Sequence, residues 1–203
     1  MTRLAYPDPA HVAHLTHGFP VPLRHMNIGK TVSHAPTLVA PYYNTYAAVL
    51  QELELDAKLR QLAILRVAER ASAPYVLVQH RALSRLAGPS DDQIGAVALS
   101  DFDRDCFSHV QKLVLAFTDE VIEGAHVSDS LFERVRSVLT PREIVELLLV
   151  IGWYWTACRL TTTLEIEPEH PMGDGVISML QVEQAKRSAQ LAAEISPDDY
   201  RVY

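Results

Sequence analysis

The feature that most constrains the fold of this chain is a helical periodicity that continues, with few interruptions, from about Leu38 to Ile166. Apolar side chains recur there every three or four residues, which is the spacing of one face of an α-helix. Prolines gather on either side of this stretch, in the first 41 residues and again from residue 168 on. The sequence therefore predicts an all-α protein whose helices lie between two irregular ends.

Capping and turn residues divide this stretch into separate helices. Predicted helices begin near Pro36, after Asp56, at Pro74, after Ser90, at Asp103, after Ser128 and after Thr140. Proline is favoured at the first helical position, and Ser, Thr and Asp are favoured as N-caps. Gly88 and Gly124 are the expected stops of the third and fifth helices, because glycine accepts the left-handed backbone that often ends a helix.

The last core helix has the clearest start. Thr140-Pro-Arg-Glu combines a capping box with proline at the first helical position. The helix is then apolar nearly all round, through Trp153, Tyr154 and Trp155. A helix without a polar face belongs inside a core or a subunit interface. Its most apolar part, Ile144 to Ala157, is interrupted by Glu146 and is too short to span a bilayer.

The length of 203 residues suits a single domain with extended ends. We expect an irregular N-terminal arm at residues 1–35, a helical domain at 36–167 and a C-terminal extension at 168–203. The extension contains a stretch of helical composition from Val176 to Ile195.

Composition and charge narrow the possible partners and location. The net charge of −7 and the isoelectric point near 5.7 argue against a nucleic-acid partner, which favours a basic patch. The N-terminus lacks the apolar run of a signal peptide, and two cysteines give no disulfide framework. We therefore expect a soluble, cytoplasmic protein without a membrane partner.

Three histidines near the N-terminus, His11, His14 and His17, are spaced three residues apart. Two histidines at this spacing can share a metal on a helix, but the third is rotated off that face. No Cys, Asp or Glu lies between them to complete a ligand set. We therefore predict no metal site here.

Three segments, in order, carry a family resemblance. They are residues 26–36, residues 59–68 followed by Tyr75 and His80, and residues 140–165. Together they resemble the carboxymuconolactone decarboxylase and alkylhydroperoxidase D-like family. The resemblance implies a multi-helix all-α bundle that assembles into homo-oligomers, trimers or hexamers.

The resemblance also shows which redox groups the chain lacks. The peroxidase branch of the family carries a CxxC pair and a histidine four residues after the second cysteine. Aligned on His80, the cysteine positions are Ala73 and Val76, and the relay glutamate of that branch falls at Gln61. Without a thiolate the nucleophile that attacks peroxide is missing, so we do not expect peroxidase activity. Cys106 and Cys158 lie alone in apolar helical stretches, where cysteine usually acts as a small hydrophobe.

The decarboxylase branch of the family lacks the redox pair and keeps a histidine at the position of His80. The resemblance therefore implies a cofactor-free lyase, with a small carboxylated lactone or carbonyl acid as substrate. Histidine transfers protons near neutral pH, and arginine binds a carboxylate through two parallel hydrogen bonds. His80 is thus the predicted catalytic residue, and the predicted substrate-binding residues are Arg66, Tyr75, Arg159 and His34.

Each of these residues also has a purely structural interpretation. His80 lies among apolar helix positions and fits a buried histidine bound to a backbone carbonyl, and Arg66 and Arg159 fit salt-bridge partners. Tyr75 fits a core residue, and His34, before a proline, fits a brace for the first core helix. Two other functions therefore stay open: a non-catalytic binding or assembly protein, and an isomerase or hydrolase.

Overall fold

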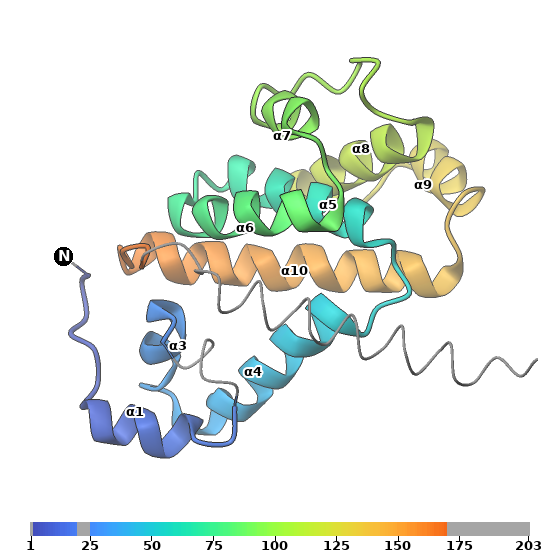
Figure 1. Ribbon diagram of the computed structural model, residues 1–203. Coiled ribbons are helices and arrows are strands. Elements are labelled where there is room, and N and C mark those ends of the chain that lie inside the picture. Colours follow the sequence, from blue (N-terminus) through green and yellow to red (C-terminus); the bar gives the residue numbers. More distant parts are fainter. Residues whose placement is uncertain (1, 20–24, 170–203) are drawn as a thin grey trace, which may run out of the picture.

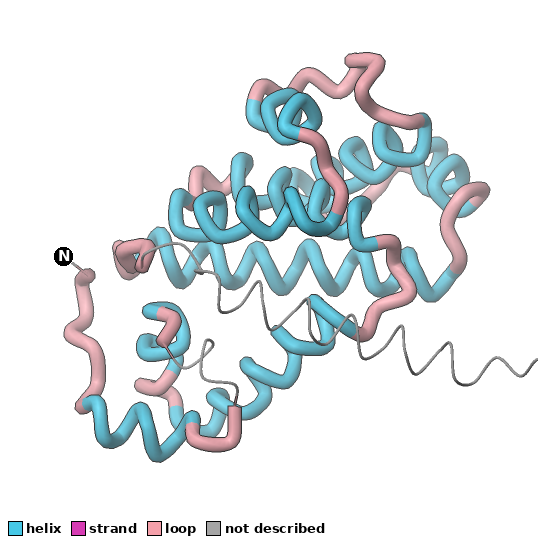
Figure 2. The backbone as a smooth tube through the Cα atoms, in the orientation of Figure 1, coloured by secondary structure: helices cyan, strands magenta, loops and turns pink. Residues whose placement is uncertain are grey.

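The computed structural model describes residues 2–19 and 25–169, and every regular element in these ranges is a helix (Figures 1 and 2). The helices are α1 (Pro9–Thr16), α3 (Asn27–Val32), α4 (Pro36–Gln51), α5 (Ala57–Arg70), α6 (Pro74–Ala87), α7 (Asp91–Ala98), α8 (His109–Gly124), α9 (Asp129–Arg136) and α10 (Pro141–Thr163). The predicted all-α fold class is confirmed.

Helix α5 lies at the centre of the bundle and packs against α6, α7, α8 and α10. Its residues from Leu59 to Ala68 are buried without interruption. Figure 1 shows α10 running between α5 and α6 on one side and α3 and α4 on the other. A contact between two tilted aromatic rings, Tyr42 of α4 and Trp153 of α10, joins the two layers, with ring centroids 4.9 Å apart.

The central helix carries polar residues into the core. Arg60, Gln61 and Arg66 of α5 are all buried. A buried polar group is costly unless it finds a partner, so each of these side chains constrains what packs against it. Gln61 binds a residue of α6 and Arg66 binds residues of α8 and of the loop after α7. The polar groups of α5 therefore position its neighbours.

Three of the predicted helix starts are confirmed by the capping geometry. Asp56 accepts hydrogen bonds from two backbone N–H groups at the start of α5, and Ser90 and Thr140 form complete capping boxes. Gly88 ends α6 with a φ of 103°, a left-handed conformation that favours glycine.

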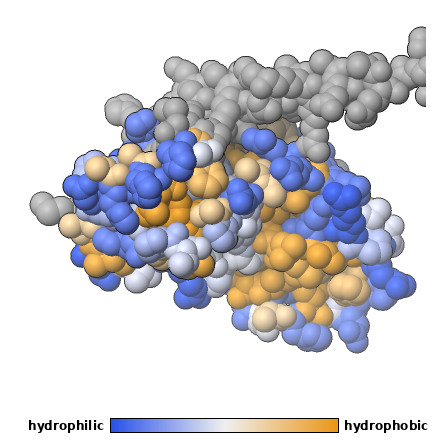
Figure 3. All heavy atoms as spheres, turned by 90° about the horizontal axis from the view of Figure 1, so that it is seen from below, coloured by the Kyte–Doolittle hydropathy of each residue, from blue (hydrophilic) through white to orange (hydrophobic). Residues whose placement is uncertain are grey.

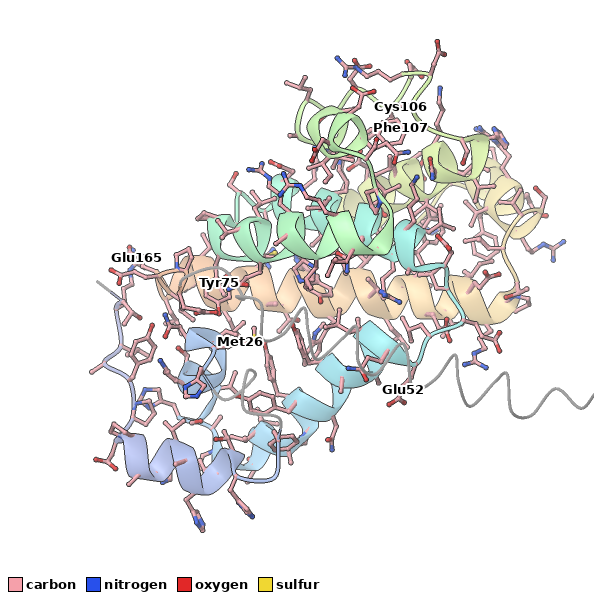
Figure 4. All side chains as sticks on the ribbon, in the orientation of Figure 1. Met26, Glu52, Tyr75, Cys106, Phe107 and Glu165 are labelled. Atoms are coloured by element: carbon pink, nitrogen blue, oxygen red, sulfur yellow. The ribbon has the colours of Figure 1, made fainter. Side chains whose placement is uncertain are left out.

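Helix α8 starts later than the sequence suggested. It begins at His109, and not at Asp103, because Ser108 and Gln111 form a third capping box. Phe107 therefore precedes the helix, although it is buried as expected. Figure 4 shows it beside Cys106 in the loop between α7 and α8.

The N-terminal 35 residues are not wholly irregular, contrary to the prediction. Asp8 caps α1 by accepting from the N–H groups of Ala10 and His11, and Pro9 occupies the first turn. Helix α3 follows with Ile28 buried. The helix predicted over residues 176–195 lies outside the described residues.

Helix α10 has two apolar faces. By length and composition it is the one helix in the described ranges that could cross a membrane, and half of its apolar window (50%) is buried within the protein. One face of α10 packs against α5 and α6 in the core. The opposite face carries a stripe of exposed side chains, Val145, Leu148 and Leu149. Figure 3 shows broad apolar patches among the charged groups on one face of the molecule.

Candidate functional site

A pocket lies where the start of α3 meets α4, α6 and α10. It contains about 330 Å³ of empty space including its open mouth, and the centre of a water molecule can move through about 20 Å³ of it. Its walls are formed by Met26, Ile28, Tyr42, Tyr46, Tyr75, Val76, Gln79, His80, Trp153, Tyr154 and Ala157. The walls are mostly apolar with a few polar groups, as is usual for small-molecule sites.

His80 contributes an imidazole to this pocket. It is buried on α6, and its Nδ1 lies 3.0 Å from Oε1 of Gln61. An amide carbonyl oxygen only accepts, so Nδ1 donates and carries the ring proton. Nε2 then keeps its lone pair, and within residues 2–19 and 25–169 it makes no hydrogen bond. His80 therefore offers a hydrogen-bond acceptor to a ligand in the pocket.

The surroundings of His80 keep it neutral. Burial, and then the positive charge of Arg60, lower the pKa of His80 to about 3. Desolvation penalises the charged imidazolium, and a nearby like charge adds to that penalty. The expectation of a histidine that titrates near neutral pH is therefore wrong for this structure, in which His80 is a neutral base.

Tyr154 supplies a second polar group. Its ring meets the imidazole of His80 edge to face, with centroids 4.7 Å apart. The phenol is buried and has no hydrogen-bond partner in residues 2–19 and 25–169, and the same holds for Nε of the neighbouring Arg60. Burial raises the pKa of Tyr154 well above its ordinary value, so the phenol stays protonated. Buried polar groups are nearly always bound, so an unsatisfied phenol in a pocket wall is suited to a ligand.

The carboxylate of Glu169 lies at the α3 side of the pocket. It accepts hydrogen bonds from Gln79 Nε2 at 2.7 Å, from the Tyr75 hydroxyl at 2.8 Å and from the backbone N–H of Asn27 at 2.9 Å. Figure 4 shows Tyr75 and Met26 close together at this end of the bundle. Burial, and then the charge of Glu169, raise the pKa of Tyr75, which is therefore a neutral donor.

Of the five predicted site residues, the structure brings His80 and Tyr75 together in the pocket. Arg66 lies elsewhere: its guanidinium binds both carboxylate oxygens of Asp119, at 2.6 and 2.9 Å, and the hydroxyl of Ser100 at 2.7 Å. Its face stacks on Phe102. With its donors engaged on the α8 side of α5, Arg66 is a structural residue and not a substrate anchor in this pocket.

Arg159 and His34 also lie outside the pocket. Arg159 is exposed on α10 and places its guanidinium over the ring of Trp155, 4.6 Å from the centroid. His34 is exposed, and its Nε2 binds the backbone carbonyl of Ala5 at 2.9 Å. His34 thus braces the N-terminal segment against the start of α4, and neither residue contacts the pocket.

The two positions that align with the redox pair of the peroxidase branch carry apolar side chains. Val76 lines the pocket and Ala73 is buried just before α6. Burial raises the pKa of the Cys158 thiol to about 12 and also raises that of Cys106. Within the described ranges, no group of three His, Cys, Asp or Glu side chains is placed to bind a metal.

Sequence reasoning missed three polar groups of the pocket: Gln79, Tyr154 and Glu169. Gln79 carried a readable signal, because it lies four residues after Tyr75 and so shares its helix face. Tyr154 was assigned to an apolar helix without a polar role. Glu169 gave no signal, since it contacts residues 90 or more positions away.

No family model matches this chain, and no curated protein matches it either. Several solved structures are similar to it. A peroxidase-related protein from Ralstonia eutropha, described as an alkylhydroperoxidase AhpD core, is 18% identical with a TM-score of 0.68, over 83% of this chain and 92% of that one. The chain has the alkylhydroperoxidase D-like fold.

Two further structures with the alkylhydroperoxidase D-like fold are similar. A peroxidase-related protein from Silicibacter is 17% identical with a TM-score of 0.68, over 83% of this chain and 92% of that one. The debrominase Bmp8, a variant in complex with 2,3,4-tribromopyrrole, is 14% identical with a TM-score of 0.66, over 87% of this chain and 95% of that one. At these identities the likeness shows the fold, and the site has to decide the function.

Proposed function

We propose that this protein is a cofactor-free lyase that removes CO2 from a small carboxylated lactone or carbonyl acid bound beside His80. The observation that carries the proposal is a neutral, buried imidazole in an apolar pocket, whose Nε2 makes no hydrogen bond within the described part of the chain. In such a reaction the bond to the carboxyl carbon breaks and its electrons move toward the substrate carbonyl. The carbon left behind then takes a proton.

The pocket supplies what this chemistry needs. Apolar walls strip water from the bound carboxylate, and its charge disperses as CO2 leaves, which favours the transition state. The buried phenol of Tyr154 donates a hydrogen bond to the carbonyl oxygen on which charge develops. Both features are present before any ligand binds.

His80 serves as the proton-transfer residue. A bound carboxylate brings a negative charge into the pocket, and an opposite charge raises the pKa of a histidine. That charge counters the effect of Arg60, which lowers the pKa of His80 in the ligand-free protein. His80 then takes up a proton with the substrate and returns it to carbon after CO2 has left.

The size of the ligand is supported by a structural neighbour. The debrominase with this fold binds a small substituted pyrrole ring. A ring of similar size that carries a carboxylate is therefore the ligand class that we propose for the pocket beside His80.

The test is CO2 release from a panel of carboxylated lactones and β-keto acids. We expect release by the wild type and a loss of at least about a hundredfold in His80→Ala, the usual scale of acid–base catalysis. His34→Ala is the matched control, because His34 lies outside the pocket, and it keeps the wild-type rate. No release from any compound contradicts the proposal, and equal release by wild type and His80→Ala moves the chemistry away from His80.

A second function has its own support. The pKa of His80, about 3, and the lack of a thiol in the pocket fit a non-catalytic binding protein. Binding of the same acids without turnover favours that function. Turnover without CO2 release favours an isomerase or hydrolase in the same pocket.

We also propose that the protein acts as a cytoplasmic homo-oligomer, a trimer or hexamer, with a small carboxylic acid as its partner. The exposed stripe of Val145, Leu148 and Leu149 supports assembly, because contiguous exposed apolar residues are typical of interaction surfaces.

A further inference from the structure

Glu169 is bound as a small ligand would be bound. Its Oε1 accepts from Gln79 and Tyr75, and its Oε2 accepts from the backbone N–H of Asn27. The Tyr75 hydroxyl is also 3.1 Å from Oε2, so it serves both oxygens. Three neutral donors from α3 and α6 thus converge on one carboxylate, and among the residues that the structure describes no ion pair contributes.

The donors are fixed independently of Glu169. Tyr75 and Gln79 are 3% and 2% exposed, and they lie on one face of α6, four residues apart. The Tyr75 hydroxyl accepts a hydrogen bond from the N–H of Ile28 at 3.3 Å, which orients its own proton toward the carboxylate. A buried donor left without an acceptor costs about 1–3 kcal/mol, so this set of donors favours an occupant.

Glu169 is half-buried, whereas Tyr75 and Gln79 are buried. It follows the end of α10, in a segment without regular structure. Asn27 Nδ2 also donates to the Glu167 carbonyl at 3.0 Å, so this segment meets α3 through its backbone as well as through the carboxylate. The half-buried carboxylate is the part of this contact that an acid ligand can replace, while Tyr75 and Gln79 stay in place.

The donors belong to the same pocket as His80. Tyr75, Gln79 and His80 all line it, and the apolar side chains of Met26, Val76 and Trp153 form the wall beside them. A ring attached to a carboxylate at the donors therefore enters the pocket that His80 also lines. The geometry fits a small apolar acid better than a neutral ring.

We infer that Tyr75, Gln79 and the N–H of Asn27 form the carboxylate-binding subsite of the pocket, and that Glu169 occupies it until an acid ligand displaces it. The inference rests on the proposed function only in taking the pocket as a ligand site. It replaces the arginines predicted as anchors with neutral donors. It also makes Glu169 a built-in competitor, whose tether gives it a high effective concentration.

The test is benzoate binding to the full-length protein by isothermal titration calorimetry. Removing the competitor in Glu169→Ala is expected to tighten benzoate binding at least about tenfold, since a tethered group competes at millimolar effective concentration. Glu165→Ala is the matched control. It removes a carboxylate from the same segment, but the Glu165 carboxylate binds Arg3 and not the donors of the pocket. Its affinity stays at the wild-type value.

Two further measurements separate a subsite from a simple opening of space. Benzyl alcohol, which has the ring without the carboxylate, binds wild type and Glu169→Ala equally. The double variant Glu169→Ala/Tyr75→Phe is expected to lose the increase in benzoate affinity that Glu169→Ala gives. An unchanged circular dichroism spectrum shows that the double variant is folded. Equal benzoate affinity in wild type and Glu169→Ala, or an equal gain for benzyl alcohol, overturns the inference. Binding is measured without turnover, so a failure of CO2 release leaves this result standing.

Discussion

The side-chain carbonyl oxygen of Gln61 lies 3.0 Å from Nδ1 of His80, and this bond decides which ring nitrogen faces the pocket. Gln61 is 2% exposed and does not titrate, so it orients the imidazole without adding charge. A carboxylate at the same position would favour the imidazolium. An amide at residue 61 thus favours a neutral His80, and a carboxylate there would favour a charged one.

The first prediction follows directly. Gln61→Glu raises the pKa of His80 from about 3 toward its ordinary value, because an adjacent negative charge favours the protonated ring. Proton-detected NMR of the imidazole as a function of pH measures the shift. Gln61→Leu, which removes the acceptor without adding charge, is the control and leaves the pKa low. An unchanged pKa in Gln61→Glu would show that Gln61 does not bond to the ring.

The second prediction concerns stability and pH. The pKa of His80 is about 3 in the folded protein, below its ordinary 6.5. Between these pH values the unfolded chain binds a proton at His80 that the folded protein excludes, so stability falls as pH falls from 6.5 toward 3. Between pH 6.5 and 5 the loss from this group is about 2 kcal/mol.

Urea unfolding of wild type and His80→Gln at these two pH values measures that loss. The wild type is expected to lose about 2 kcal/mol more than the variant, because other titrating groups are common to both. Parallel losses in the two proteins would mean that His80 titrates normally in the fold.

The third prediction concerns Arg66. Its bidentate pair with Asp119 is largely buried, with side-chain exposures of 5% and 25%. Arg66→Ala leaves the Asp119 carboxylate without that partner and destabilises the protein by about 2 to 3 kcal/mol. Benzoate affinity stays unchanged, because Arg66 lies outside the pocket. A selective loss of binding with normal stability would restore Arg66 as a substrate anchor.

The fourth prediction concerns assembly. Leu149 is 65% exposed in the stripe on α10, and a charge there weakens any contact that buries it. Leu149→Asp is expected to lower the mass measured by light scattering from an oligomer to a monomer. Leu99→Asp is the matched control, since Leu99 is 71% exposed at the end of α7 and outside the stripe. A monomeric wild type, or an oligomeric Leu149→Asp, contradicts assembly through α10.

Much of the fold could be predicted because helix boundaries are local. Asp56, Ser90 and Thr140 each cap the helix that the sequence assigned to them. The error at α8 was also local. Ser108 and Gln111 carried a capping-box signature, but the apolar pattern around Phe107 favoured an earlier start.

The site was less accessible, because it depends on contacts between distant residues. The family motif predicted His80, and Tyr75 lies on the same helix as His80. No pattern in the neighbouring sequence shows that the Glu169 carboxylate binds a residue of α6. The same is true of the hydrogen bonds that Arg66 donates to Asp119. The choice between an anchor and a structural arginine is made by packing, which residue spacing does not contain.

The central claim is that His80 presents a neutral Nε2 lone pair to a ligand pocket. The direct measurement is 15N NMR of the imidazole nitrogens, assigned with His80→Gln, in the absence and presence of benzoate. We predict a protonated Nδ1 and an unprotonated Nε2 from pH 7 down to about 4, because the pKa is about 3. We also predict a change at Nε2 on adding benzoate. A pKa of His80 near 6.5 would contradict the account. So would a 15N chemical shift of Nε2 that stays the same when benzoate is added.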